Sequence, residues 1–264
     1  MNAVVVLELL DLDTPAIPLP VDALDDAEQA RAARFFYAED RRRFIHGRAW
    51  LRLRLGEALG LAPQDVRFTT VGTRGKPAIA SKLAPTVPSG IASKLAPTIS
   101  GLAPTSSVGS SLLPTFNLSH SDRFGLLALS ASGLAVGVDI EVARPFERAA
   151  RIAARHFSEL EAAAIEACAP GAEREQAFFR TWTRKEAYLK LTGLGLPGGL
   201  ACIETGIGSD ARTVLVPPEH GLSTAWIASL DGPPPLGQPA DGGLPPLALA
   251  ALAAPHPVEL RWRE

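Results

Sequence analysis

The chain has 264 residues, of which 47% are hydrophobic, and its 26 basic and 28 acidic side chains give a formal net charge of −2. A chain of this length and composition can bury a substantial core as one domain or two small ones, which excludes disorder throughout. The near-neutral charge excludes a global attraction to nucleic acid or anionic lipid, so any anion-binding site must be local.

The cysteine content and the absence of long apolar stretches indicate a soluble protein of a reducing compartment. Cys168 and Cys202 are too few for a disulfide framework, and we expect free, partly buried thiols. No stretch reaches the roughly 18 uninterrupted apolar residues that a membrane-spanning helix needs. The first residues, MNAVVVLELLDLD, lack a basic start and a cleavage site. We therefore expect a cytoplasmic protein without a membrane segment.

The first elements in chain order are a strand and a pair of helices. The apolar run Val4–Leu10 predicts a strand. Helical character extends from Asp22 to Gly60, with a break near Tyr37 and a second, arginine-rich helix from about Glu39. Val66–Val71 alternates as a strand, and the sequence GTRGKP after it predicts a turn.

A low-complexity segment interrupts the chain after this turn. The eight residues IASKLAPT occur twice at an offset of twelve, and residues 81–111 consist mainly of Ser, Pro, Thr, Gly and Ala without an apolar period. Such a segment cannot pack a core of its own. We therefore predict an inserted surface loop at about 81–111 and a second, Pro/Gly-rich loop at about 232–246.

Strands and then helices are predicted after the insertion. Apolar strands at 124–130 and 134–141 flank turn residues and predict a hairpin, and a basic helix follows. Ser158 and Glu161 form a capping-box pattern at the start of another helix. A long helix is predicted from Ala172 to Leu191, ending at Gly193. Further strands are predicted at 203–207, 213–216, 225–229, 247–253 and 258–262. Because helices and strands segregate rather than alternate, the fold class is α+β.

The second strand of the predicted hairpin ends in the sequence GVDIE. Successive strand side chains point to opposite faces, so Asp139 and Glu141 share one face while Val138 and Ile140 share the other. Taken alone, two carboxylates at a strand end are more often solvated surface than a metal site.

The long helix carries charged groups beside a buried aromatic stripe. Helical geometry places Glu186 and Lys190 together on one shoulder of the stripe and Lys185 on its other margin. An ordinary Glu to Lys pair four residues apart explains the pairing but not its position at the edge of the stripe. The position suggests a site where a carboxylate faces a cation and the amines face anions.

Further basic and polar residues can be assembled with these. GTRGKP places Lys76 on a turn, NLSHSD places Ser119 and His120 at a strand end, and EDRRRF places Arg43 in an arginine-rich turn. Singly, they are a turn lysine, a surface histidine and a solvated helix face. Together they form an anion site beside three carboxylates, which fits a substrate with several phosphates bound with Mg²⁺.

The chain resembles the 4'-phosphopantetheinyl transferases, of the larger monomeric type that acts on synthetase and synthase carrier domains. Five pieces match in order, namely FYAEDRRRF, RGKP, FNLSHS, GVDIE and WTRKEAYLKLTGLGL. They span about two thirds of the chain, and the pair GVDIE and WxxKEAxxK, separated by about 40 residues, is the specific part.

The resemblance implies roles for individual residues. Asp139, Glu141 and Glu186 match magnesium-binding carboxylates, and Glu186 is also the candidate base. Coenzyme A would be held by Arg43, Lys76, Ser119 and His120, with Lys185 and Lys190 near its pyrophosphate and Lys190 also catalytic. Arg31 falls where the family often has a further basic residue.

The resemblance also implies a reaction and an architecture. The activity is that of a holo-acyl-carrier-protein synthase: a serine of an acyl or peptidyl carrier protein attacks coenzyme A, and 3',5'-ADP leaves. The implied fold is a pseudo-twofold pair of similar α+β halves, residues 1–115 and 116–264, in one monomer with the site at their interface. The family has only a few residues where this chain carries the duplicated segment, so that segment interrupts the fold.

The sequence is also compatible with two other functions. The arginine-rich segment 31–54 could bind RNA or another polyanion, with Phe44 and Trp50 stacking on bases, although helical spacing assigns these aromatic rings to packing. A family member without activity that only binds its carrier protein is the second alternative, and the complete carboxylate set argues against it.

Overall fold

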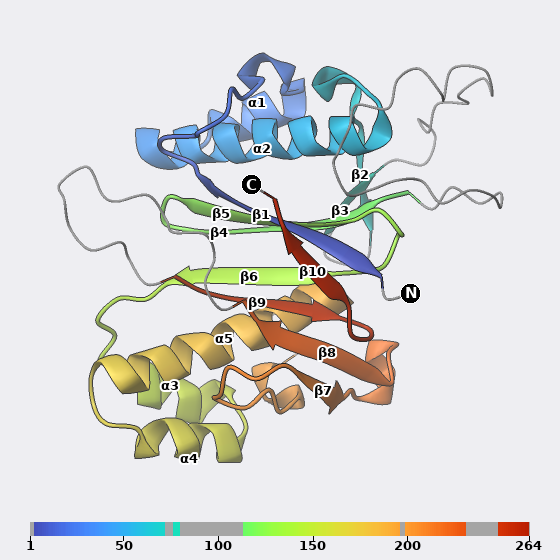
Figure 1. Ribbon diagram of the computed structural model, residues 1–264. Helices are drawn as coiled ribbons and strands as arrows, with labels where there is room; N and C mark the ends of the chain where they lie inside the picture. Colours follow the sequence, from blue (N-terminus) through green and yellow to red (C-terminus); the bar gives the residue numbers. More distant parts are fainter. Residues whose placement is uncertain (1–2, 72–75, 80–112, 196–198, 231–247, 264) are drawn as a thin grey trace.

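The structure is a computed structural model that describes residues 3–71, 76–79, 113–195, 199–230 and 248–263 (Figure 1). The insertion predicted at 81–111, the loop predicted at 232–246 and most of the GTRGKP turn lie outside these residues. The strands are β1 (Val4–Asp11), β2 (Phe68–Val71), β3 (Lys76–Ile79), β4 (Thr115–Ser121), β5 (Phe124–Ser130), β6 (Gly137–Val142), β7 (Arg212–Leu215), β8 (Thr224–Ser229), β9 (Ala248–Ala254) and β10 (Glu259–Trp262). The helices are α1 (Asp26–Ala32), α2 (Ala38–Leu59), α3 (Ala149–His156), α4 (Glu159–Ala167) and α5 (Ala172–Thr192).

Two four-stranded sheets form the centre of the molecule. Sheet 1 has the order β10-β1-β5-β4, and sheet 2 has the order β6-β9-β8-β7. β1 pairs antiparallel with β5 and parallel with the C-terminal strand β10. The short β2 and β3 pair with each other as a separate ribbon.

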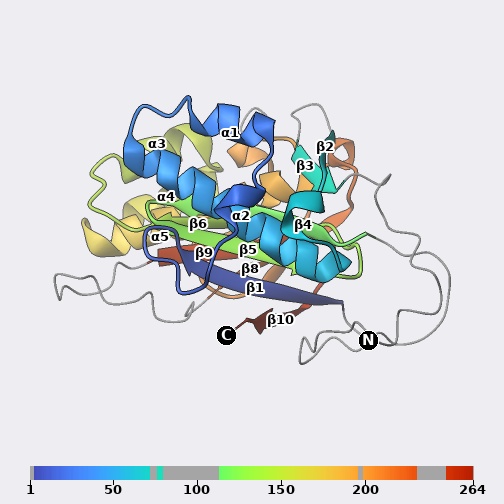
Figure 2. The same ribbon diagram turned by 90° about the horizontal axis from the view of Figure 1, so that it is seen from above.

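The sheets and helices stack in four layers, with α1 and α2 on one side and α3, α4 and α5 on the other (Figure 1). Figure 2 shows from above that α2 lies across the strands of sheet 1. Alternate residues of β5 serve two cores, because Leu127 packs in the cluster beneath α2 while Leu126 and Ala128 pack between the sheets. In β9, Ala251 and Ala253 likewise face the cluster around α5. The layers are therefore held by three apolar cores.

Local signals explain the helix boundaries. A complete capping box between Asp25 and Glu28 begins α1. α2 begins after Tyr37, carries acidic residues in its first turn, and ends at Gly60, whose φ of 68° is the left-handed conformation that glycine accepts. The predicted capping box of Ser158 and Glu161 is present at the start of α4, and α5 ends at Gly193 as predicted.

The predicted hairpin of the strands at 124–130 and 134–141 is wrong. β5 pairs with β4 along its whole length, through a turn at Asp122 and Arg123, and with β1 on its other edge. Because both edges of β5 are occupied, β6 cannot join it and instead pairs with β9 in sheet 2.

The edges of the two sheets are joined by side chains at β4 and β6. The Asn117 side-chain oxygen accepts a hydrogen bond from the Val138 N–H at 2.8 Å, and the Ser121 hydroxyl accepts one from the Val142 N–H at 3.1 Å. These bonds satisfy edge N–H groups of β6 without a backbone ladder. The polar positions of β4 thus fix β6, with its carboxylates, at the junction of the sheets.

The strand predicted at 203–207 is also wrong. This segment is irregular, because the Glu161 carboxylate accepts hydrogen bonds from the N–H groups of Thr205 and Gly206, and Lys185 donates to the carbonyl of Ile203. Side chains thereby satisfy backbone groups that a neighbouring strand would otherwise pair.

The α+β fold class and the free thiols of Cys168 and Cys202 are confirmed. Within the described ranges, no helix combines the length and the apolar character needed to cross a membrane. The pseudo-twofold relation and the division near residue 115 stay predictions.

Candidate functional site

The site begins with the two faces of β6. Val138 and Ile140 are buried in the core between the sheets, as the alternation predicts. Asp139 is 4% exposed and accepts hydrogen bonds from Ser119 and from Lys190 of α5. Glu141 is half-buried and accepts a hydrogen bond from the Ser121 hydroxyl at 2.8 Å. β4 and α5 therefore both contribute partners to the carboxylate face of β6.

A glycine allows α5 to approach this face closely. A Cβ atom on Gly137 would lie 2.0 Å from the carbonyl oxygen of Ala187 and 2.4 Å from the backbone nitrogen of Leu191. Only a residue without a side chain fits between this strand and the helix. The close packing brings Lys190 Nζ to 2.6 Å from Asp139 Oδ1 and to 2.7 Å from the Ser119 hydroxyl.

The three predicted metal ligands influence one another electrostatically. Burial is the largest effect that raises the pKa of Asp139, and Lys190 only partly offsets it. Burial also raises the pKa of Glu141, with the charge of Asp139 adding to this effect. The pKa of Glu186 is raised by burial and then by the charges of Asp139 and Glu141. Three mutually repelling carboxylates are thus held where a cation would relieve the repulsion.

The chemistry of this donor set fits a divalent cation. Asp139 Oδ2 is buried without a hydrogen-bond partner, although its other oxygen has two. In the described ranges, no three acidic, histidine or cysteine side chains converge closely enough to form a complete metal site as they stand. Mg²⁺ needs only one or two protein carboxylates beside phosphate oxygens and waters. Asp139, with Glu141 and Glu186 next to it, can supply that part of a coordination shell.

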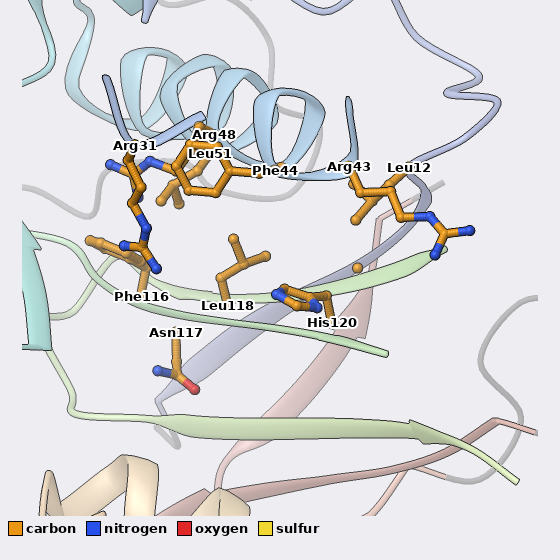
Figure 3. A pocket seen from close by; sticks show the side chains of 12 residues that line it. Leu12, Arg31, Arg43, Phe44, Arg48, Leu51, Phe116, Asn117, Leu118 and His120 are labelled. Carbon is orange, nitrogen blue, oxygen red and sulfur yellow. The ribbon is translucent and has the colours of Figure 1, made fainter. Parts of the chain in front are cut away.

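On the other side of β4 lies a cavity of about 210 Å³ beneath α2. Figure 3 shows Phe116, Leu118 and His120 pointing from β4 into this cavity, whereas Asn117 points away from it. The cavity lining combines four basic side chains with an apolar wall: Arg31, Arg43, Arg48, His120, Phe44, Leu51, Phe116 and Leu118. We call this cavity the cation pocket. It suits a ligand with an apolar ring and a phosphate group.

The end of β4 connects the cation pocket with the carboxylates. His120 points into the pocket, and its neighbour Ser119 points to Asp139 on the opposite face. Desolvation is the main cause that lowers the pKa of His120, and the charge of Lys190 acts in the same direction. Favouring the neutral ring lets His120 donate or accept a hydrogen bond without adding charge.

The sequence is similar to proteins of one known family. A family model described as the 4'-phosphopantetheinyl transferase superfamily matches residues 135–233. The 4'-phosphopantetheinyl transferase HetI of Nostoc sp. is 35% identical over 189 residues, which cover 71% of this chain and 68% of HetI. The chain belongs to the 4'-phosphopantetheinyl transferase superfamily.

Two further relatives also carry names of 4'-phosphopantetheinyl transferases. A Synechocystis sp. protein named as a candidate 4'-phosphopantetheinyl transferase is 32% identical over 192 residues, covering 73% of this chain and 66% of that protein. The 4'-phosphopantetheinyl transferase Sfp of Bacillus subtilis is 26% identical over 194 residues, covering 73% and 71%. The chain therefore spans about two thirds of the length of these curated relatives.

The predicted transferase residues are distributed over two places in the structure. Asp139, Glu141, Glu186, Lys190 and Ser119 form the carboxylate face, and all except Ser119 lie within the range that the family model matches. Arg43 and His120, together with Arg31, line the cation pocket. The side chain of Lys76 lies outside the described part of the molecule, so its role stays a prediction.

Lys185 is not brought to either place. Its side chain is fully buried, with Nζ 2.7 Å from Glu161 Oε2, 2.6 Å from the carbonyl oxygen of Leu200 and 2.5 Å from that of Ile203. In this position the ammonium group joins α5 to α4 and to the segment after α5.

Some residues of the site were not predicted from the sequence. Asn117 and Ser121 lie two positions on either side of Ser119, and this polar period of two on β4 is a signal that could have indicated an edge facing other polar groups. Asp13, which pairs with Arg43, carries no such signal, because the two are 30 positions apart.

Proposed function

We propose that this protein transfers the 4'-phosphopantetheine group of coenzyme A to a serine of an acyl or peptidyl carrier protein, with Mg²⁺, and releases 3',5'-ADP. One observation carries the proposal. The mutually coupled carboxylates and Lys190 lie on one face of the β4 edge, and a pocket with four basic side chains lies on the other. A donor lying over the end of β4 would place its nucleotide in the cation pocket and its pyrophosphate beside the carboxylates.

The residues of this chain divide the chemistry among them. Bound Mg²⁺ would neutralise charge on the pyrophosphate, and Asp139, Glu141 and Glu186 are the residues that would hold it. Lys190 stands beside Asp139, where its ammonium group can stabilise the charge that grows on the leaving phosphate. Glu186 is suited to accept a proton, because a raised pKa brings a carboxylate nearer to working pH.

The serine oxygen of the carrier attacks the pantetheine-side phosphorus of coenzyme A while Glu186 takes the hydroxyl proton. The bond between that phosphorus and the bridging oxygen breaks, and the electron pair leaves with 3',5'-ADP. No protein nucleophile is required, so the main contributions are positioning and charge stabilisation.

The arginine-rich helix α2 does not favour the alternative of RNA binding. Trp50 is completely buried and cannot stack on a base. Arg52 pairs with Glu28 and Asp25, and Arg54 pairs with Glu8. Inward-facing, paired arginines act in packing this helix rather than as a free polyanion surface. We further propose that the protein is a cytoplasmic monomer whose partners are coenzyme A and a carrier protein. Size-exclusion chromatography would test whether it is a monomer.

A transfer assay tests the proposed function. The protein is incubated with coenzyme A, Mg²⁺ and a panel of apo carrier proteins from fatty-acid, polyketide and peptide synthesis, and each carrier is weighed by mass spectrometry. We expect at least one carrier to gain one phosphopantetheine group, and the gain to disappear with a chelator. A folded protein that modifies none of the carriers would contradict the proposal.

A further inference from the structure

The basic side chains of the cation pocket differ in how much of their charge is already balanced. Arg43 Nε and Nη2 donate to the two oxygens of Asp13 at 3.0 and 2.8 Å, and Nη1 lies 2.9 Å from Asp122 Oδ1. Arg48 pairs with Glu28. Among the residues that the structure describes, Arg31 has no carboxylate partner, and its guanidinium group lies over the Phe44 ring at 5.2 Å.

The arrangement leaves Arg43 with little capacity for a ligand. A guanidinium group has five N–H donors, of which Arg43 uses two on Asp13, and its Nη1 also forms an ion pair with Asp122 at 2.9 Å. Any phosphate that uses the remaining N–H groups must approach two carboxylates at hydrogen-bond distance from the same guanidinium. Arg42 also donates to Asp13, at 3.1 Å, so the two arginines and two aspartates sum to zero formal charge.

Asp13 is held in place by its own part of the chain. The Asp11 carboxylate accepts hydrogen bonds from the N–H groups of Asp13 and Thr14 at 2.9 and 3.2 Å, and it pairs with Arg123 of the turn between β4 and β5. The hydrogen bond from Arg43 is the largest effect on the pKa of Asp13, which falls to about 2. Asp13 therefore has an anchored backbone and a carboxylate that is ionised at neutral pH and held against Arg42 and Arg43.

We infer that Asp13 is a specificity-determining residue, which balances Arg43 and so lowers the preference of the cation pocket for a nucleotide with a 3'-phosphate over the same nucleotide without it. The inference rests on the proposed function, because it assumes that the pocket takes the nucleotide end of the donor. The protein then discriminates between coenzyme A and dephospho-coenzyme A less than the three arginines of the pocket alone would, and Arg31 carries the charge that remains available.

Binding measurements test this inference without carrier protein. Coenzyme A and dephospho-coenzyme A are titrated separately by calorimetry into the wild type and Asp13→Asn with Mg²⁺, and the ratio of the two dissociation constants is compared. At the dielectric constant of water, a unit charge a few ångströms from a singly charged group changes a dissociation constant several-fold, and the phosphate carries nearly two charges. We expect Asp13→Asn to raise the preference for the 3'-phosphate by roughly 5- to 30-fold.

Two further variants make the result specific. Asp122→Asn removes the second partner of Arg43 and should raise the same ratio, since asparagine tolerates the φ of 51° at this position. Asp40 is the matched control, because it is exposed in the first turn of α2, the helix that carries Arg43, and its charge acts on His120. We expect Asp40→Asn to change the ratio by less than about twofold.

The outcomes separate the inference from the proposed function. An unchanged ratio in both Asp13→Asn and Asp122→Asn, with thermal unfolding showing that the variants are folded, overturns the inference and leaves the transferase proposal standing. A rise of equal size in Asp40→Asn also overturns it, because the effect would then be general electrostatics. A wild type that binds neither compound, and that modifies no carrier, contradicts the proposed function itself.

Discussion

Replacing Lys185 by methionine should lower the stability of the folded protein without weakening its binding of coenzyme A. Lys185 is completely buried, and its partner Glu161 is 2% exposed. Burial alone would raise the pKa of Glu161, but Lys185 and the N–H groups of Thr205 and Gly206 hold it below its ordinary value. The pair therefore binds α4, α5 and the segment after α5 together as a buried, hydrogen-bonded unit.

The size of the effect follows from what Lys185→Met leaves behind. Removing one partner of a buried ion pair typically costs about 3–5 kcal/mol, because the other charge stays buried. Glu161 keeps its hydrogen bonds to Thr205 and Gly206, so we expect the lower end, about 3 kcal/mol. For a chain of this size that corresponds to a fall in the unfolding temperature of about 6–12 °C.

Thermal unfolding and calorimetric titration of coenzyme A measure the two effects separately. The double variant Glu161→Gln with Lys185→Met has no uncompensated buried charge. It should therefore be more stable than either single variant. If Lys185→Met keeps its unfolding temperature but binds coenzyme A more than tenfold more weakly, the reasoning is refuted. Lys185 would then act near the pyrophosphate, as the family resemblance implies.

Three further predictions concern the carboxylate face and the insertion. Gly137→Ala should separate α5 from β6 and abolish transfer while lowering the unfolding temperature, since its Cβ would meet the Ala187 carbonyl at 2.0 Å; full activity would contradict the close approach. Glu186→Gln should abolish transfer without destabilising the fold. Because the pKa of Glu186 is raised in the folded state, ionising this carboxyl group costs stability. The stability of Glu186→Gln relative to the wild type should therefore increase as the pH rises through the folded pKa. A variant that is less stable than the wild type at neutral pH would argue against this. Deleting residues 81–110 should leave the transfer rate largely intact, and a collapse of coenzyme A affinity would show that the loop belongs to the site.

The elements predicted best from the sequence are those with strong local signals. The break before α2, the capping box at Ser158 and the glycine stop at Gly193 were each predicted from a few neighbouring residues. The pairing of strands was not, because the almost continuously apolar sequence of β5 does not show which strands lie along its two edges. The irregular course of residues 203–207 depends on Glu161, which is more than 40 positions away.

The same distinction applies to the candidate site. The faces that Asp139, Glu141, Glu186 and Lys190 occupy on their own elements could be predicted, because a strand has a period of two and neighbours on a helix face are four positions apart. The burial of Lys185 could not be predicted. The margin of an amphipathic helix is buried only if a neighbouring element packs against it, and the helix sequence does not show which element does so. Helical geometry alone does not show that a carboxylate and two carbonyl groups await its ammonium group.

The two faces of β4 suggest how donor binding and catalysis depend on each other. Ser119 and His120 are adjacent, yet one contacts Asp139 and Lys190 while the other lines the cation pocket. A donor that spans them would contact both sheets where β4 meets β6 and where Asn117 and Ser121 bind the edge of β6. Asn117→Ala should therefore raise the Michaelis constant for coenzyme A and lower the transfer rate together, because it loosens the carboxylates relative to the pocket. If steady-state kinetics showed only one of the two constants changing, the pocket and the carboxylates would be independent.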